Sequence, residues 1–281
     1  MNVGPRIFRV GSDWRAPIAA LEGLYRDYPQ PAKSVPDFTV RLEATAWHRR
    51  FIRPQITIAG DYTLPDAVPV SLDHGLIAAE MAMNLQLALG ERRFLILHAA
   101  SVEKDGKALI ITGESGAGKS TLSAILGANG WRFMGDEFAL IDPVSGMAHA
   151  FPRPISLKNE AINVVQKLMP SAHYGPMQVR TAKGDIRHLA PDVGAISAMH
   201  ETAKPALILF PRFGSSEDVR EMGMGEIFVR LTQASTNYTV LGEAGYDALT
   251  RLVTTVPTRA LDYPDTKTAL SAVSRLWAEL A

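Results

Sequence analysis

GESGAGKS, residues 113–120, is the stretch of this 281-residue sequence that decides its fold. The apolar run KALIIT (107–112) precedes it, and STLSAILGANG (120–130), which has the composition of a helix, follows it. The fixed positions of the pattern G-x-x-x-x-G-K-[ST] are filled by Gly113, Gly118, Lys119 and Ser120. A strand, a glycine-rich loop and a helix in this order are the context of a phosphate-binding loop, so the stretch predicts a nucleotide-binding α/β domain.

Each residue type in this loop has a defined task in holding phosphate. Gly116 and Gly118 allow the backbone to curl so that successive N–H groups point at phosphate oxygens, and the positive end of the helix dipole adds to them. We expect Lys119 to reach the β- and γ-phosphates and the Ser120 hydroxyl to bind Mg²⁺. A tight glycine turn before a helix would explain the glycines, but not the adjacent lysine and serine. The predicted nucleotide contacts are Gly113, Glu114, Ser115, Gly116, Ala117, Gly118, Lys119, Ser120 and Thr121.

Motifs elsewhere narrow the class of nucleotide-binding protein. The sequence has neither the N-K-x-D motif that reads guanine nor the L-S-G-G-Q signature of ABC-type transporter ATPases, so we expect neither a Ras-like GTPase nor a transporter ATPase. The apolar strand ALILF (206–210) ends in Pro211-Arg212, where a Walker B strand would carry an aspartate. The carboxylate that such a site needs must therefore come from another segment.

Asp136-Glu137 is the obvious source of that carboxylate, because the pair directly follows a predicted strand and a glycine. One acidic side chain could position or deprotonate an attacking hydroxyl, and the other could hold a metal ion. Gly-Asp-Glu is also ordinary turn chemistry, so a solvated turn remains the alternative.

Charge and composition exclude several other functions. Lys plus Arg and Asp plus Glu both number 29, so the formal net charge is zero. This balance argues against a general nucleic-acid-binding protein, which needs a basic face. The nearest basic cluster, at residues 48–53, favours a solvated strand or turn. The absence of cysteine excludes disulfides, thiolate metal sites and cysteine nucleophiles, and it fits a reducing cytoplasm.

No membrane segment is expected from the sequence. The first residues, MNVGPRIFRVGSDWR, lack the continuous apolar core of a signal peptide. The longest apolar stretch, GLIAAEMAMNLQLALG at 75–90, is interrupted by Glu80, Asn84 and Gln86. It therefore predicts an amphipathic helix and not a membrane span.

The pattern along the chain predicts two parts joined by a helix. Residues 1–72 alternate apolar and polar residues between Pro- and Gly-containing breaks, which predicts a small sheet-rich region. Residues 73–93 predict the connecting helix, which we expect to run from about 74 to 89 with Asp73 as its N-cap and Gly90 just past its end. Residues 94–281 predict the nucleotide-binding domain. Within that domain we expect a hairpin over 94–112, a helix over 155–169, a buried strand over 205–213, and closing helices over 243–256 and 266–280.

The stretch from FLILHAAS through IITGESGAGKST to WRFMGDE resembles the catalytic domain of HPr kinase/phosphorylase, a bacterial serine kinase with a fold related to phosphoenolpyruvate carboxykinase. The intervals from His98 to Gly113 and from Lys119 to Asp136 also look like those of the family. The resemblance implies that Asp136 is the catalytic carboxylate and that Glu137 lies near the metal. It also implies a place for His98 near the phosphates or the acidic pair, where the alternative is an ordinary core histidine.

Two departures from that family bear on the reaction. Glu137 stands where family members have a second aspartate, which keeps the charge. The family's Glu-Ile-Arg-Gly signature, associated with the reverse phosphorylase reaction, is replaced by PRPISLKNE (152–160). Arg153 and Lys158 of this segment are candidate phosphate or acceptor contacts, or members of a solvated helix N-terminus. The pattern fits better with HPr-kinase-related proteins, some of which are associated with peptide modification or with PqqD-like partners.

Three functions follow as expectations. The first is an ATP-dependent kinase that phosphorylates a hydroxyl, serine in the first instance, on a small protein or peptide. The second is a kinase for a small metabolite, and the third is a regulatory protein that binds ATP without transferring phosphate. Asp136 distinguishes the third from the others, because a binding protein has no use for a base. The resemblance also implies a homo-oligomer, and we expect residues 1–72 to act in partner recognition or assembly.

Overall fold

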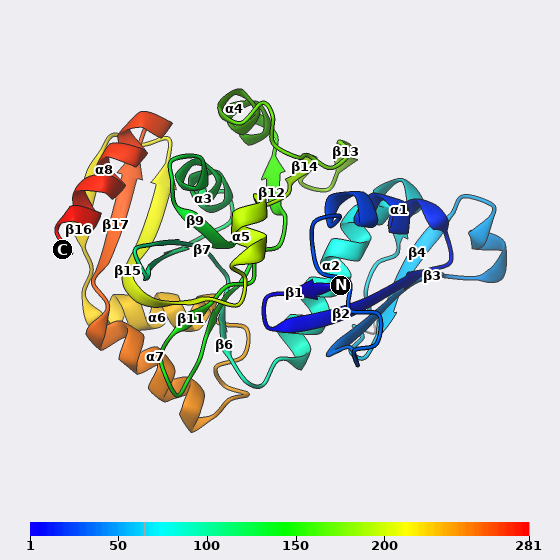
Figure 1. Cartoon of the computed structure of the whole chain (residues 1–281), viewed down its shortest axis with the longest axis horizontal. Coiled ribbons are helices and arrows are strands. Elements are labelled where there is room, and N and C mark those ends of the chain that lie inside the picture. The colour runs from blue at the N-terminus through cyan, green and yellow to red at the C-terminus, as the bar shows by residue number, and fades with distance from the viewer. Residues whose placement is uncertain (65, 281) are drawn as a thin grey trace.

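The computed structural model describes residues 1–64 and 66–280, and it shows a mixed α/β protein in two parts. Figure 1 shows the N-terminal sheet with its two helices at one end and a larger sheet covered by helices at the other. Over the described residues, no helix has both the length and the apolar character needed to cross a membrane.

The N-terminal part is a five-stranded sheet packed against two helices. Its strands follow the order β1-β2-β3-β4-β5 across the sheet, and β2 pairs with β3 in parallel. Their bounds are β1 Asn2–Val3, β2 Arg6–Ser12, β3 Phe38–Ala44, β4 Gln55–Gly60 and β5 Val70–Ser71. This confirms the predicted strands, but the sequence pattern missed helix α1 (Arg15–Leu24). α1 is the crossover that two parallel neighbouring strands require.

Helix α2 (Gly75–Gly90) joins the two parts, as predicted, but its ends differ from the prediction. A 3₁₀ turn at Leu72–His74 precedes it, and the Ser71 hydroxyl accepts from the backbone N–H of Asp73 at the start of that turn. Asp73 is therefore not the N-cap of α2. Gly90 is the last helical residue, and the chain becomes extended at the next position.

The larger part is built on a nine-stranded sheet whose central strands are parallel. The path across it is β6-β10-β11-β15-β8-β7-β9, and β17 pairs with both β15 and β16. β15 runs parallel to β8 and to β17. The bounds are β6 Leu95–Leu97, β7 Ala99–Lys104, β8 Lys107–Thr112, β9 Arg132–Gly135, β10 Ala139–Ile141, β11 Ala148–His149, β15 Thr202–Phe213, β16 Asp218–Glu221 and β17 Thr258–Tyr263. The predicted buried strand at 205–213 is the C-terminal part of β15.

Helices cover both faces of this sheet, and each face has its own apolar core. Helices α3 (Lys119–Ala128) and α8 (Thr266–Ala278) pack on one face with buried residues such as Leu109 and Leu209. Helices α6 (Met224–Ala234) and α7 (Glu243–Thr255) pack on the other face with residues such as Ile110 and Ile208. Alternate residues of a strand point to opposite faces, which explains why neighbouring positions belong to different cores. α7 and α8 confirm the two predicted closing helices.

Two predicted elements are divided in the structure. The stretch FLILHAASVE is not one strand of a hairpin: it breaks at His98, so that β6 pairs with β10 while β7 pairs with β8. The predicted helix over 155–169 begins as a strand, β12 (Ile155–Lys158), and only then becomes α4 (Glu160–Leu168). β12 belongs to a three-stranded sheet with β13 (Gln178–Thr181) and β14 (Gly184–Leu189). A short helix, α5 (Val193–Ser197), follows that sheet.

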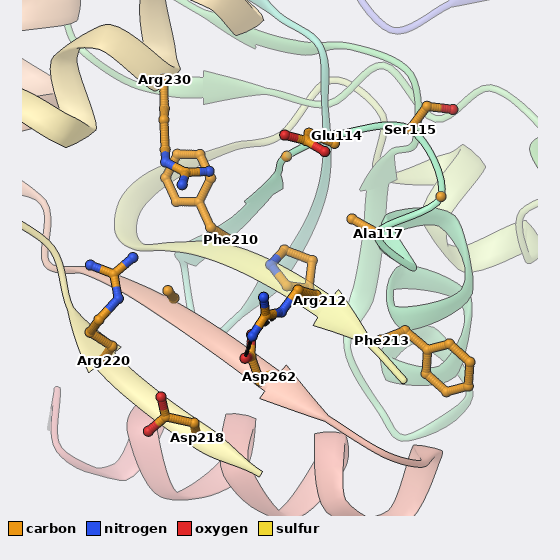
Figure 2. A pocket seen from close by; sticks show the side chains of 14 residues that line it. Glu114, Ser115, Ala117, Phe210, Arg212, Phe213, Asp218, Arg220, Arg230 and Asp262 are labelled. Atoms are coloured by element: carbon orange, nitrogen blue, oxygen red, sulfur yellow. Dashed lines mark hydrogen bonds and ion pairs between the residues drawn. The ribbon is translucent and has the colours of Figure 1, made fainter. Parts of the chain in front are cut away.

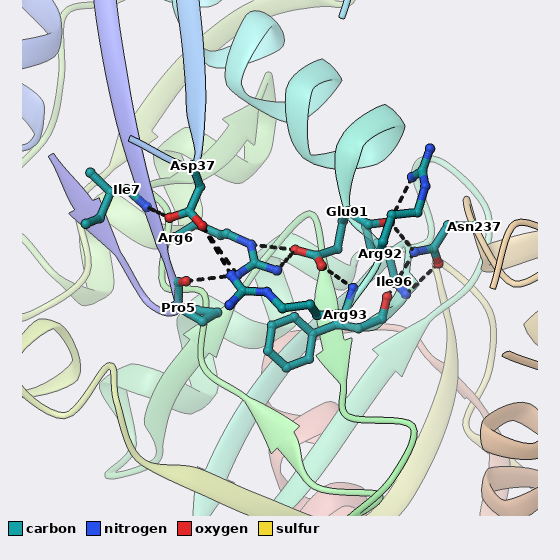
Figure 3. Close-up of polar contacts among 10 residues, drawn as sticks. Pro5, Arg6, Ile7, Asp37, Glu91, Arg92, Arg93, Ile96 and Asn237 are labelled. Atoms are coloured by element: carbon teal, nitrogen blue, oxygen red, sulfur yellow. Dashed lines mark hydrogen bonds and ion pairs between the residues drawn. The ribbon is translucent and has the colours of Figure 1, made fainter. Parts of the chain in front are cut away.

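The two parts share an apolar core, in which Phe8 and Tyr25 of the N-terminal part lie with Phe151 and Leu140 of the larger part. Around the end of α2 a polar network ties them further (Figure 3). Its central pair is Arg6 of β2 and Glu91, whose side chains are both buried. The connecting helix is therefore a packed joint between the parts.

Asn237, from the larger part, binds the segment that connects the end of α2 to β6 (Figure 3). Its side-chain oxygen accepts from the backbone N–H of Ile96 at 2.9 Å, and its side-chain nitrogen donates to the carbonyl oxygens of Glu91 and Phe94 at 3.2 and 2.9 Å. These bonds set the path of the chain from α2 into β6, and so they help to position His98 at the end of that strand.

Candidate active site

The loop at 113–118 connects β8 to α3 in a conformation that its glycines make possible. Gly113, Gly116 and Gly118 have φ values of 147°, 86° and 95°, a region that other residues rarely adopt. A side chain at Gly118 would also meet the Tyr263 hydroxyl. The backbone is therefore curled at the N-terminus of α3, where helix N–H groups and the helix dipole favour anions.

Lys119 lies across this loop. Its side chain folds back so that Nζ donates to the carbonyl oxygens of Gly113 at 2.7 Å and Glu114 at 2.9 Å. Burial lowers the pKa of Lys119, and the nearby carboxylates of Asp136 and Glu137 oppose this effect. The lysine is 8% exposed, so its cation is held inside the loop.

Asp136 follows β9 directly and is buried, with 3% of its surface exposed. One carboxylate oxygen, Oδ2, accepts from the backbone N–H of Ser156 at 3.2 Å, and Oδ1 has no hydrogen-bond partner. Burial, and then the charge of Glu137, raise the pKa of Asp136 to about 7, while the nearby Ser120 hydroxyl and the backbone N–H of Ser156 act in the opposite direction. A carboxylate with such a pKa can take up or release a proton near neutral pH.

His98 and Glu137 lie side by side at the edge of the site. The distance from His98 Nδ1 to Glu137 Oε2 is 3.6 Å, and both side chains are partly exposed. Burial lowers the pKa of His98, and the charge of Glu137 acts against it. The position of His98 follows from the strand break described above, because the residue stands between β6 and β7.

These residues meet in a cavity of about 700 Å³ on the side of the sheet that α3 and α8 cover. The predicted site residues that line it are His98, Ser115, Gly116, Gly118, Lys119, Ser120, Thr121, Asp136, Glu137 and Lys158. Apolar side chains of α3 and α4 form much of the remaining wall, among them Ile125 and Val164.

The structure does not bring four of the predicted site residues to this cavity: Gly113, Glu114 and Ala117 line the other side of the loop, and Arg153 lies away from the loop. Arg153 is 3% exposed, and its guanidinium contacts Glu80, Asn84 and Tyr25 at the junction of the two parts. These partners occupy its hydrogen-bonding groups, so the structure gives no support to a phosphate contact by Arg153.

Several residues of the site were not anticipated from the sequence, and three of them bear on its chemistry. Ser156 supplies its backbone N–H to Asp136, Lys183 lies at the β13–β14 turn, and Tyr263 ends β17 beside Gly118. A strand signal in ISLK, where Ile155 and Leu157 alternate with polar residues, could have revealed the first of them. Lys183 and Tyr263 come from segments far along the chain and carry no local signal.

The chemistry of the site fits Mg²⁺. Ser120, Asp136 and Glu137 offer oxygen atoms, which are the ligands that Mg²⁺ prefers, and Asp136 Oδ1 is a buried oxygen without a partner. Over residues 1–64 and 66–280 there is no cluster of three or more His, Cys, Asp or Glu side chains that could hold a metal by themselves. Two carboxylates and a hydroxyl suit Mg²⁺, which completes its coordination with waters or phosphate oxygens.

No protein-family model matches the chain, and no curated protein matches it. Among solved structures, the chain is similar to the HPr(Ser) kinase/phosphatase from Coxiella burnetii. The identity is 16% and the TM-score 0.30, and the match covers 66% of this chain and 98% of that chain. The similarity is distant, so a function for this protein has to rest on the residues of its own site.

Proposed function

We propose that this protein is an ATP-dependent kinase that transfers the γ-phosphate to a hydroxyl, serine in the first instance, of a small protein or peptide. The observation that carries the proposal is the buried carboxylate of Asp136 in one cavity with Lys119 and Ser120. A protein that only binds nucleotide needs the lysine and the serine. A buried carboxylate with a raised pKa costs free energy to maintain, and a group that can take the proton of an attacking hydroxyl is what phosphoryl transfer needs in addition.

In the proposed reaction Asp136 acts as general base. The acceptor hydroxyl gives its proton to the Asp136 carboxylate while its oxygen forms a bond to the γ-phosphorus. The bond from that phosphorus to the bridging oxygen breaks, and ADP leaves. Lys119 stabilises the negative charge that spreads over the phosphate oxygens. Ser120 and Glu137 would hold Mg²⁺, which supplies further positive charge to the phosphates.

Other residues of the cavity would orient the Glu137 carboxylate and the acceptor. His98 lies against Glu137 and limits the positions that this carboxylate can take. Lys158 and Lys183 line the cavity from β12 and the β13–β14 turn, and both would attract acidic groups next to the acceptor hydroxyl. We assign the N-terminal part to recognition of the acceptor or to assembly, with a PqqD-like protein and a second copy of the chain as the partners to test.

Labelling with [γ-³²P]ATP tests the proposal. The protein is incubated with the labelled nucleotide, Mg²⁺ and a lysate, and labelled polypeptides are separated from labelled small molecules. We expect a labelled polypeptide whose label is stable to acid, as a phosphoserine ester is. Label only in a small molecule would show a metabolite kinase, and binding without any transfer would leave a regulatory ATP-binding protein.

Replacing the loop lysine tests the nucleotide site. We expect Lys119→Ala to weaken ATP binding in the presence of Mg²⁺ about 10- to 100-fold, because hydrogen bonds to charged groups contribute about 1.5–3 kcal/mol. Titration calorimetry measures the affinity, with Lys33→Ala, an exposed lysine of the N-terminal part, as the matched control. Equal affinities of wild type and Lys119→Ala would show that the lysine is a structural residue that only ties the loop together.

A further inference from the structure

A second cavity, of about 530 Å³, lies on the other side of the phosphate loop. Figure 2 shows it between the loop, the ends of β15 and β17, strand β16 and helix α6. Ser115 and Gly116 line both cavities, so the loop forms the wall between them. The proposed reaction uses no residue whose side chain faces only this second cavity.

Residues at the ends of the parallel strands β15 and β17 line both cavities. On β17, Asp262 lines the second cavity and Tyr263 the first; on β15, Phe213 borders both. Both cavities lie where the parallel strands β8, β15 and β17 end, which is the edge of an α/β sheet where ligands bind. A ligand that crosses the loop at Ser115 and Gly116 would have one end in each cavity.

The charges of the second cavity are balanced within the protein. Its three arginines all have carboxylate partners: Arg212 pairs with Asp262, and both Arg220 and Arg230 pair with Glu226. The carboxylates of Glu114 and Asp218 line the cavity as well. A phosphate would have to break these ion pairs and approach acidic groups, so the cavity does not suit a second anion.

The second cavity does present flat side-chain surfaces, namely guanidinium planes and aromatic rings. Arg212 donates from Nε to Asp262 Oδ1 at 3.0 Å and from Nη2 to Asp262 Oδ2, and these two parallel bonds hold the guanidinium in one plane (Figure 2). The Arg212 side chain is 69% exposed, so a face of that plane is open. Phe213 beside it is 59% exposed, and Arg230 covers the Phe210 ring at 5.5 Å from its centroid. Guanidinium planes and aromatic rings are the surfaces on which nucleobases stack.

We propose that this cavity receives the nucleobase and ribose of the nucleotide whose phosphates lie in the loop, and that the base stacks on the plane of the Arg212–Asp262 pair. The proposal rests on the proposed function, because it assumes a nucleotide in the loop. The volume of the second cavity lies within the range of small-molecule sites. In this arrangement the second cavity holds the nucleoside, and the first holds the γ-phosphate, the metal and the acceptor.

Comparing the affinity for ATP with the affinity for inorganic tripolyphosphate distinguishes contacts to the nucleoside from contacts to the phosphates. We expect Arg212→Lys, which keeps the charge but loses the plane, to weaken ATP binding by about 5-fold or more, the lower end of what removing one stacking partner of a base costs. The affinity for tripolyphosphate should not change. Ala260→Leu, which narrows the same cavity from β17, should show the same selective loss. Arg259→Lys, on the same strand but outside the cavity, is the matched control and should bind both ligands like wild type.

Each result of this experiment decides a separate point. If both cavity variants bind ATP like wild type, the nucleoside lies elsewhere and the inference is wrong, while the proposed function stands. If they lose ATP and tripolyphosphate equally, the substitutions act on the loop, and the stacking role is also refuted. If wild-type protein binds neither ligand, the proposed function fails, and this inference fails with it.

Discussion

Asp136→Asn is expected to slow phosphoryl transfer by about 10²–10⁴-fold, the usual contribution of a general base. The substitution keeps the size of the side chain and can still accept from the backbone N–H of Ser156, so the local structure should survive. It removes the group that takes the proton. Nucleotide affinity should change little, because it comes mainly from the loop amides, Lys119 and the metal.

Single-turnover transfer to the identified acceptor, measured beside ATP affinity, tests this expectation. Glu137→Gln is the informative comparison. If Glu137 holds the metal, its loss should change Mg²⁺ dependence and nucleotide affinity together, whereas loss of the base should change transfer alone. Wild-type transfer by Asp136→Asn would refute the assignment and leave Glu137 or His98 as the base. A loss of ATP binding in Asp136→Asn would show instead that this carboxylate belongs to the nucleotide site.

Arg153→Met is expected to lower the free energy of unfolding by about 3–5 kcal/mol, the cost of breaking a buried ion pair from one side. Arg153 and Glu80 are both almost completely buried, and Glu80 has a carboxylate oxygen with no partner even in the intact pair. Glu80, with Tyr25, raises the pKa of Arg153 against the effect of burial, so the guanidinium stays charged. Without the arginine, the Glu80 carboxylate would be buried and uncompensated between the two parts of the protein.

Urea denaturation measures the effect, with Arg26→Met as control, because Arg26 pairs with Asp27 on the surface. The double variant Arg153→Met/Glu80→Met should recover most of the lost stability, since replacing both members of a buried pair by apolar residues is often neutral. An Arg153→Met protein as stable as Arg26→Met would show that water or another group solvates Glu80. Failure of the double variant to recover would show that packing of the guanidinium, and not charge, is what stabilises the junction.

Local chemistry made the loop and its surroundings predictable from the sequence. Three glycines in a left-handed or otherwise unusual backbone, followed by a lysine, a serine and a helix-forming run, can hardly adopt another arrangement. The same holds for the break after Gly135, where two charged residues interrupt an apolar strand and end β9. In both cases the structural signal lies within a few residues of the feature it predicts.

Segments whose structure depends on distant neighbours were predicted less well. Residues 155–158 read as the start of a helix because the helical pattern of α4 follows them, but pairing with β14 makes them a strand. That strand brings Ser156 to Asp136 and Lys158 to the cavity. Helix α1 was missed because its role, to connect the parallel strands β2 and β3, appears only once their pairing is known.

By itself the sequence determined a mixed α/β protein, it predicted a phosphate-binding loop, and it named Asp136, Glu137 and His98 as residues to examine. Only the tertiary structure decided which side chains meet. It turned Arg153 toward Glu80 of α2 and away from the cavity, placed His98 against Glu137, and joined Arg212 to Asp262 across parallel strands. The physical reason is that backbone preference and hydrophobic period act over a few residues, whereas strand order and burial set the partners of a charge at any separation along the chain.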